Sequence, residues 1–387
     1  HRDLHASLAP SEMCIRDRKC TDTCCAGWEI IIDDETYENY NKVSGEFGER
    51  LRSNLTLYED GEPGFVLQNN NCPFLNKNNL CDIYTELGEK SLCYTCKTYP
   101  RLIEEYSNLR EMGVSLSCPE AARLILQDPK PITFEVSDDY EEEKPYDDIN
   151  FDISMQLISA RKMALDILQD RSIDLNHRIA LVINFAHDIQ EEINKNELSK
   201  IKNTVDRYSS ESYKKELLNK FDKYKAKQSY KYKNMLKCMN VYKNLNPIND
   251  NWPQILDHAI DCFYKIDNVT FYKKQYDDFN EYYKTRTYEY EHLMVYFIFQ
   301  YFMKAIFDEE LCSKVTLAVM SYLIIKELNV VRWIDNNYNF DINDQIDIMH
   351  MYSKEVENSE KTLYDLEEMF NTSRIFDLEQ LLILIMN

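Results

Sequence analysis

The chain has no glycine after Gly113, although it continues to residue 387. Loops that hold phosphates and dinucleotides depend on glycine, and neither G-x-G-x-x-G nor the P-loop pattern occurs anywhere in the sequence. This absence argues against a standard Rossmann cofactor domain. H-E-x-x-H and G-x-S-x-G are missing as well, which removes the usual signatures of zinc metalloproteases and α/β-hydrolases.

Long apolar runs and an excess of positive charge are also absent. No apolar stretch approaches the roughly 20 residues that span a bilayer, and the N-terminus lacks a basic-then-apolar signal pattern. The net charge of −22 disfavours a nucleic-acid partner, because phosphates repel carboxylates. The same charge suits a basic or lysine-bearing protein substrate, or it serves solubility alone. These features predict a cytoplasmic protein with no membrane span, and they leave the oligomeric state open.

Glycine and proline are confined mainly to the first part of the chain. All seven glycines lie at or before Gly113, and eight of the ten prolines lie at or before Pro145. Since these residues mark turns and loops, the first part is expected to be loop-rich and the rest almost wholly helical. The predicted fold class is mainly α, with a loop-rich cysteine and metal-binding region at 19–136, an acidic linker at 137–150 and an irregular all-helical bundle at 151–387.

Apolar residues recur at steps of three and four from Ile153 onward, which is the spacing of an amphipathic helix. Trp252-Pro253 interrupts the pattern, because the residue before a proline avoids helical geometry. Further helices are expected near 253–265, 288–307, 310–328, 341–357 and 376–386. Cysteines and histidines that stand singly in this part are predicted to be core or surface residues rather than ligands: Cys238, Cys262, Cys312, His177, His187, His258, His292 and His350.

Residues 1–18 differ in character from the sequence that follows. The stretch SEMCIRDR, from Ser11 to Arg18, resembles translated sequencing-adaptor sequence. On that interpretation the segment is a doubtful tail, and Cys14 is excluded from the chemistry. An ordinary flexible tail is the alternative, and it leads to the same exclusion.

Eight cysteines crowd into the first third of the chain, and this crowding needs a chemical reason: Cys20, Cys24, Cys25, Cys72, Cys81, Cys93, Cys96 and Cys118. A chain of this length does not need disulfides to fold, and clustered cysteines in a reducing compartment bind metal more often than each other. Only two residues separate Cys93 from Cys96, so both thiolates can reach one ion, as in zinc sites and iron–sulfur clusters. The adjacent Cys24 and Cys25 point in different directions, which suits two centres or one centre plus a structural role. Spacing alone leaves zinc, iron–sulfur and disulfides as alternatives.

These motifs, taken together, resemble those of a known family. The chain contains Cys-x3-Cys-Cys-Ala-Gly-Trp, Cys-Pro-Phe-Leu, Leu-Cys-Asp-Ile-Tyr, Cys-x2-Cys with Thr-Tyr-Pro-Arg behind it, and Ser-Cys-Pro-Glu, beginning at residues 20, 72, 80, 93 and 117. From about Lys19 onward the sequence is similar to the FliB family, the flagellin lysine-N-methylases. Two late segments, 290–297 and 352–360, look like helices of that family.

The resemblance implies an enzyme, a protein-lysine N-methyltransferase that moves a methyl group from S-adenosylmethionine to lysine side chains of flagellin, the protein of the bacterial flagellum. It also implies an iron–sulfur cluster of the 4Fe–4S type held by N-terminal cysteines, with zinc as the alternative metal. The eight cysteines are carried over as a set, without a choice of four ligands. The family usually has a further cysteine that would fall at Ile15, so the recorded N-terminus departs from the family pattern.

Arg101 follows the Cys93–Cys96 pair and is expected beside the metal centre. The hypothesis is that Arg101 binds a carboxylate of the cofactor, and a structural Arg–acid pair is the alternative. Lysine methylation also needs a group that lowers the proton affinity of the amine, and the sequence does not identify it. A non-enzymatic zinc-binding adaptor and a metal-delivery protein are the competing functions.

Overall fold

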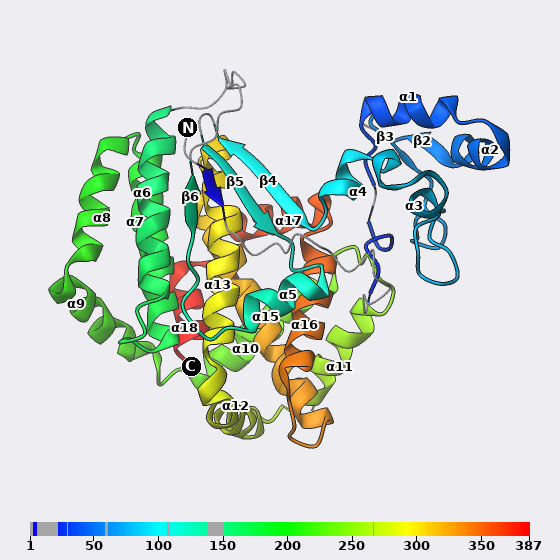
Figure 1. Cartoon of the computed structure of the whole chain (residues 1–387). Coiled ribbons are helices and arrows are strands. Elements are labelled where there is room, and N and C mark those ends of the chain that lie inside the picture. Colours follow the sequence, from blue (N-terminus) through cyan, green and yellow to red (C-terminus); the bar gives the residue numbers. More distant parts are fainter. Residues whose placement is uncertain are drawn as a thin grey trace.

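The chain forms a small lobe that carries six of the ten described cysteines and a larger body of helices (Figure 1). The computed structural model describes residues 3–5, 22–28, 30–58, 61–106, 109–137, 151–265 and 267–387. Cys14, Ile15, Cys20 and residues 138–150 of the expected acidic linker lie outside the described residues. We call residues 22–98 the cysteine lobe, and its elements are α1 (Asp34–Lys42), α2 (Gly45–Asn54), β2 (Leu55–Leu57), β3 (Pro63–Phe65), α3 (Asp82–Leu87), η2 (Glu89–Ser91) and α4 (Tyr94–Thr98).

Helices dominate the body, as the sparse glycine and proline predict, and the expected fold class is confirmed. The helix α15 (Leu311–Asp335) runs through its centre and is buried along nearly its whole length. A helix that is apolar on all sides needs neighbours all round, and α15 packs against α7, α13, α16 and α17. The other helices of the body are α5 (Pro119–Leu126), α6 (Phe151–Leu168), α7 (Leu175–Asn194), η3 (Leu198–Lys200), α8 (Ile201–Ser209), α9 (Glu211–Phe221), η4 (Asp222–Tyr224), α10 (Gln228–Lys243), α11 (Trp252–Tyr264), α12 (Val269–Tyr283), η5 (Lys284–Arg286), α13 (Tyr288–Tyr301), η6 (Phe302–Lys304), α14 (Ala305–Asp308), α16 (Ile342–Val356), α17 (Glu360–Thr372), η7 (Arg374–Phe376) and α18 (Leu378–Met386).

A four-stranded sheet lies against the body, in the order β4-β5-β1-β6. The strands β4 and β5 pair antiparallel, β1 runs parallel to β5, and β6 pairs antiparallel with β1. Gly113 of β5 lies close to the body, because a Cβ at this position would stand 3.1 Å from the Gln300 side chain. The bounds of the strands are β1 (Asp3–His5), β4 (Arg101–Tyr106), β5 (Leu109–Val114) and β6 (Glu135–Ser137).

The described side chains form two separate hydrophobic cores. The larger core spans the body and includes residues of β5 and α5, so the segment after Tyr106 packs with the helices. The smaller core lies inside the cysteine lobe and combines apolar residues with cysteines, among them Ile30, Ile32, Tyr40, Leu51, Phe65, Phe74, Cys25, Cys72 and Cys93. Asp33 links two helices of this lobe, since one carboxylate oxygen accepts from the Thr36 amide at 3.0 Å and the other from the Tyr94 amide at 2.7 Å.

The lobe contacts the body through polar side chains. The Asp22 carboxylate lies 2.7 Å from Nε2 of His350 and 2.6 Å from Nζ of Lys354, both on α16. The Asn70 side chain donates to the Ile248 carbonyl at 2.8 Å. Glu355, also on α16, accepts from the Ile248 amide at 2.9 Å and so holds the 246–251 turn in place. These contacts position the lobe over one end of α16.

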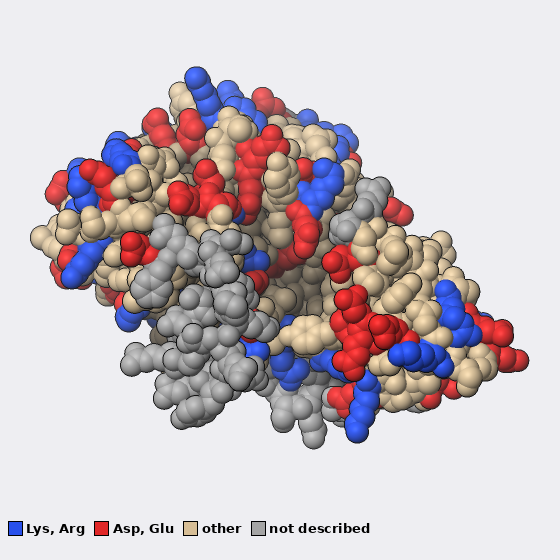
Figure 2. Space-filling model, turned by 90° about the horizontal axis from the view of Figure 1, so that it is seen from above, with Lys and Arg blue, Asp and Glu red and all other residues tan. Residues whose placement is uncertain are grey.

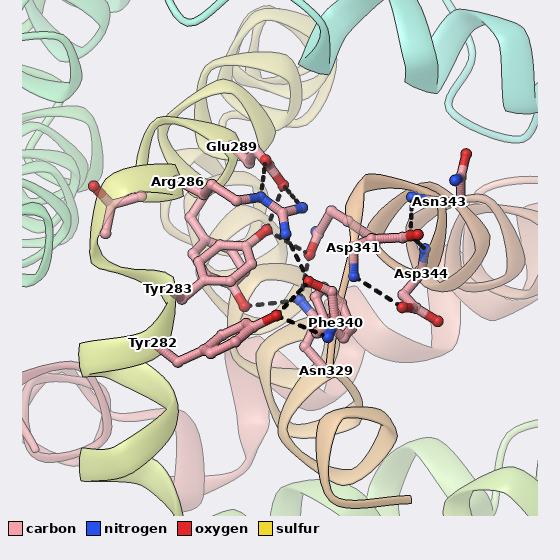
Figure 3. Close-up of polar contacts among 12 residues, drawn as sticks. Tyr282, Tyr283, Arg286, Glu289, Asn329, Phe340, Asp341, Asn343 and Asp344 are labelled. Carbon is pink, nitrogen blue, oxygen red and sulfur yellow. Dashed lines mark hydrogen bonds and ion pairs between the residues drawn. The ribbon is translucent and has the colours of Figure 1, made fainter. Parts of the chain in front are cut away.

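A buried polar network stabilises the end of the body remote from the lobe (Figure 3). Arg286 donates to Glu289 at 2.7 Å and to the Phe340 carbonyl at 2.9 Å, and its guanidinium lies over the Tyr283 ring. Tyr282 donates to the same Phe340 carbonyl at 3.1 Å. Because the Glu289 side chain is fully buried, the hydrogen bonds that it accepts from Arg286 and from the Tyr283 hydroxyl are needed to satisfy it.

Charged side chains of both signs are interspersed over the face shown in Figure 2. No helix in the described part of the chain is long and apolar enough to cross a membrane.

The expected helices are found with small shifts at their ends. The segments 253–265, 341–357 and 376–386 correspond to α11, α16 and α18, and the helix expected at 310–328 continues to Asp335 as α15. The single helix expected at 288–307 is instead divided into α13, η6 and α14. The helices α8, α12 and α17 were not predicted. Polar and aromatic residues interrupt the apolar spacing of α12, and burial of Tyr272, Tyr276 and Tyr283 takes the place of aliphatic contacts there.

Candidate metal centre and cleft

Six cysteines of the lobe lie in one neighbourhood, which we call the cysteine cluster: Cys24, Cys25, Cys72, Cys81, Cys93 and Cys96. The Cys72 amide donates to the Cys25 carbonyl at 2.7 Å, which brings two distant motifs together. Cys81 and Cys93 stand immediately before α3 and α4. Backbone amides of the turns that follow hydrogen-bond to the sulfur atoms of Cys72 and Cys81. Local turns and helix starts therefore direct the thiols inward.

The thiols of the cluster contact one another in two groups. Cys25 hydrogen-bonds to Cys24 and Cys81, while Cys93 hydrogen-bonds to Cys96. The Cys24 contact raises the pKa of Cys25, the Cys25 contact raises that of Cys81, and burial raises the pKa of Cys72 to about 12. The contact with Cys96 lowers the pKa of Cys93. Like charge opposes several thiolates together, and a bound cation would supply the opposite charge.

The donor types of the cluster fit a thiophilic metal. The described cysteines are free thiols, and sulfur is the ligand preferred by structural zinc and by iron–sulfur clusters. Within the described ranges, however, no three Cys, His, Asp or Glu side chains are arranged to hold an ion as they stand. The cluster therefore has the chemistry of a metal site, and its thiols must rotate to close around an ion.

A cleft with a volume of about 950 Å³ separates the cysteine lobe from the body. Trp28 and Tyr99 form part of its wall, with their ring centroids 5.4 Å apart. The Trp28 indole donates to the Cys24 carbonyl at 2.8 Å, so this wall is attached directly to the cysteine cluster. Burial raises the pKa of Tyr99, whose hydroxyl lies 3.1 Å from that of Ser117. The cleft and the cluster are thus neighbouring parts of one structure.

Glu357, at the end of α16, lies on the opposite side of the cleft. Tyr296 and Tyr301 donate to its Oε2 at 2.8 and 3.0 Å. The Ser353 side chain, one turn earlier on the same helix, also hydrogen-bonds to this carboxylate. Burial raises the pKa of the carboxyl group, and the hydrogen bonds from Ser353, Tyr296 and Tyr301 oppose this shift. The side-chain nitrogen of the adjacent Asn358 is a buried polar atom for which the described parts of the chain provide no partner.

Comparison with known proteins gives a family match for the helical body. Residues 161–384 match the FliB lysine N-methylase C-terminal domain, which is more than half of the chain. The chain belongs to the FliB lysine N-methylase family. Residues 13–114 match a second model, described as a zinc- or iron-chelating domain. The metal-type chemistry of the cysteine cluster therefore agrees with an independent match.

Curated relatives of the family match a shorter segment. The flagellar biosynthetic protein FliU of Salmonella muenchen is 34% identical over 116 residues, which cover 28% of this chain and 69% of FliU. Lysine-N-methylases of Salmonella typhimurium and Salmonella choleraesuis are each 33% identical over 118 residues, covering 28% of this chain and 29% of theirs. The matched segment thus spans less than a third of these two relatives. No solved structure matches the chain.

The two family models meet across the cleft. The cysteine-rich match ends at residue 114 and supplies Trp28, Tyr99 and Arg101, whereas the FliB match begins at residue 161 and supplies Glu357. The cleft therefore lies between residues matched by the zinc- or iron-chelating model and residues matched by the FliB model.

The expected site residues lie partly in the cysteine cluster and partly along the cleft. Six of the eight cysteines gather in the cluster, while Cys118 stands apart at the start of α5 and Cys20 is outside the described residues. Arg101 begins β4 and lines the cleft, and its role stays a prediction. Glu357 was not singled out from the sequence. Its place in the 352–360 segment was the available signal, since that segment resembled a family helix.

Proposed function

We propose that the protein is an S-adenosylmethionine-dependent lysine N-methyltransferase that acts on flagellin, with a 4Fe–4S cluster held in the cysteine lobe. The observation that carries this proposal is the cleft, where the lobe faces the FliB lysine N-methylase domain. Family membership supports the reaction class, and the name of the relative FliU supports a flagellar setting. The acidic chain, with a net charge of −22, suits a lysine-bearing substrate.

The dimensions of the cleft agree with two reactants. Small-molecule sites have volumes of about 300–1,000 Å³, and the cleft of about 950 Å³ lies near the upper end. It therefore has room for the methyl donor and for a lysine side chain that enters from a protein substrate. Holding the amine in line with the methyl–sulfur bond supplies much of the acceleration that such a transfer needs.

The cysteine cluster would hold the metal centre. When bound, the metal would tie the loops of the cluster together, and Trp28, which forms part of the cleft wall, is joined to the cluster through the Cys24 carbonyl. The residues of the chain would then orient the reactants, and Arg101, which lines the cleft, would bind the donor's carboxylate as a charged bidentate partner.

The function is tested by incubating anaerobically purified protein with flagellin and donor carrying a labelled methyl group. We expect label in flagellin lysines, located by mass spectrometry, and none when the flagellin lysines have been blocked chemically. A colourless protein that contains only zinc and transfers no label would instead support the alternative function, a non-enzymatic zinc-binding adaptor.

Cysteine substitutions should distinguish the cysteines that bind the metal from those that do not. Cys25→Ser and Cys93→Ser are expected to lose most of the bound iron, because each removes a buried thiol of the cluster. Cys262→Ser is the matched control, since Cys262 packs against the core of the body. Iron and zinc per chain are measured by mass spectrometry of the metals. Equal metal content in all three variants would show that the cluster is not the metal site.

Replacing Arg101 with alanine should weaken binding of the methyl donor. A charge-assisted contact of this kind contributes about 1.5–3 kcal/mol, which corresponds to a loss of roughly tenfold to a hundredfold in affinity. Calorimetric titration with S-adenosylmethionine measures the change, and Arg52→Ala in the lobe is the control because Arg52 bonds to carbonyls near the end of α1. Unchanged affinity in Arg101→Ala would exclude the contact.

A further inference from the structure

The strand β4 forms one edge of the four-stranded sheet, on the side of the cysteine lobe (Figure 1). Its only strand neighbour in the described part of the chain is β5. Two of its side chains hold it against the body. Oε1 of Glu104 lies 3.1 Å from Nζ of Lys304, and the ring centroid of Tyr106 lies 5.9 Å from that of Phe307. The side of β4 turned away from β5, which we call its outer edge, is therefore fixed in place.

The hydrogen bonds of β4 show which backbone groups the outer edge carries. The Ser115 amide donates to the Pro100 carbonyl at 2.8 Å, and the register continues with Leu102 opposite Gly113. In an antiparallel ladder every second pair of residues exchanges both hydrogen bonds. The even-numbered residues of β4 therefore bond to β5, and the backbone N–H and C=O of Ile103 face the outer edge. Neither of these two groups has a hydrogen-bond partner among the described residues.

The outer edge borders the cleft. Ile103 lines the cleft, as do its neighbours Arg101 and Leu102. Side chains alternate between the two faces of a strand, so Arg101 and Ile103 share the face opposite to Glu104, whose side chain reaches the body. An edge of this kind is a template for a further strand, because its N–H and C=O groups match those of another extended chain. A helix does not offer this match, since its backbone groups bond within the helix.

We propose that the outer edge of β4 binds an extended segment of the protein substrate as an additional strand and so presents a lysine of that segment to the cleft. This proposal rests on the proposed function and adds the form in which the substrate is recognised. In this mode of binding the main-chain hydrogen bonds supply affinity, and pockets for alternate side chains supply specificity. Two exposed carboxylates that line the cleft, Glu62 and Glu360, complement the positive charge of a lysine-bearing segment.

The proposal predicts a period of two along the bound segment. A residue of the added strand that bonds to Ile103 directs both of its backbone groups toward β4, and the residues on either side of it direct theirs away. Every second amide of the segment is therefore needed for binding, and the amides between them are not. A substrate held by its side chains alone has no such alternation.

The test measures binding of short, fluorescent, lysine-bearing peptides that tile flagellin, in the absence of the methyl donor. The peptide that binds most tightly is then made with a single backbone N-methyl group at each position in turn, which removes one N–H. Affinity, followed by fluorescence anisotropy, should fall about two- to tenfold at every second position of the bound segment, as expected for one lost hydrogen bond. At the positions between them it should stay close to that of the unmodified peptide.

A variant of the chain locates the strand on β4. Ile103→Pro removes the N–H at the outer edge and leaves the bonds of the neighbouring residues to β5 in place, since edge strands tolerate proline where it does not interrupt the ladder. This variant should bind the unmodified peptide about two- to tenfold more weakly. Ile103→Ala is the matched control, because it keeps the N–H and should keep the alternation. Circular dichroism checks that both variants fold, and the peptide series on wild type needs neither of them.

The outcomes separate the binding mode from the function beneath it. If no peptide binds, or if all N-methyl positions have equal effect, the added strand is overturned. Full affinity in a folded Ile103→Pro variant would overturn its place on β4. A wild type that sediments as a dimer, together with a monomeric Ile103→Pro, would show instead that β4 pairs two copies of this chain. Alternation without methyl transfer in the labelled flagellin assay would overturn the proposed reaction and leave the binding mode in place.

Discussion

Replacing Arg161 with methionine is expected to lower the free energy of unfolding by about 3–5 kcal/mol. Arg161 on α6 and Glu111 on β5 form an ion pair whose side chains are only 3% and 4% exposed. Arg161 also donates to the Phe299 carbonyl at 3.2 Å, and its guanidinium lies 5.1 Å from the Phe299 ring centroid. Without the arginine, the Glu111 carboxylate would remain buried without a counter-charge. The pair therefore holds the sheet against the body.

Denaturation with urea, followed by circular dichroism, measures this effect. The double variant Arg161→Met/Glu111→Leu should recover most of the loss, because replacing both buried charges with apolar groups removes the unpaired carboxylate. Lys162→Met is the control, as Lys162 and its partner Asp166 are 75% and 56% exposed and such pairs contribute about 0–1 kcal/mol. A single variant as stable as the control would show that the buried pair does not hold the sheet.

The second large effect concerns a buried lysine in the body. Lys231 on α10 is 4% exposed, and its ammonium lies 4.0 Å from the centroid of the Tyr276 ring. Burial lowers the pKa of Lys231 to about 7, and it lowers that of the neighbouring Lys326 to about 8. The acidic groups that face Lys231 are Glu327 and Asp277, and Glu327 accepts from Tyr264 at 2.7 Å and Tyr272 at 3.0 Å.

The sign of the pH dependence follows from proton binding. Between a pKa of about 7 in the folded chain and about 10.4 in the unfolded chain, the unfolded state binds a proton at Lys231 that the folded state does not. Lys231 therefore destabilises the fold at pH 7, and this cost decreases as the pH rises toward 10. Lys231→Met should be more stable than wild type by about 1–4 kcal/mol at pH 7, with the difference closing by about pH 10.

Urea unfolding at several pH values tests this prediction through the difference between variant and wild type, so that the titration of cysteines and tyrosines common to both cancels. The control is Lys233→Met on the same helix, where the lysine is exposed and the difference should not depend on pH. A Lys231→Met variant that is less stable than wild type at pH 7 would mean that the ammonium is needed as the partner of Glu327.

Parts of the site could be predicted because their chemistry is local in sequence. Two thiols separated by two residues, as in Cys93 and Cys96, can reach each other across a single turn, and the pair is indeed in contact. The contact of Cys25 with Cys81, like the hydrogen bond from the Cys72 amide to the Cys25 carbonyl, joins motifs that are far apart in the sequence, and no spacing rule contains it. The metal identity and the ligand set stay predictions for the same reason, since they depend on how these loops close.

The sequence by itself determined the helical class, the loop-rich first part and the concentration of thiols, because glycine, proline, apolar spacing and cysteine act over a few residues. Which side chains of different helices come into contact was decided by the tertiary structure alone. Glu357 is one of many carboxylates in an acidic chain, and it is distinguished by the hydroxyls of Tyr296 and Tyr301, more than fifty residues earlier, which donate to it in the interior. Burial and partners at that distance along the chain arise from packing, and packing determines which carboxylates line the cleft.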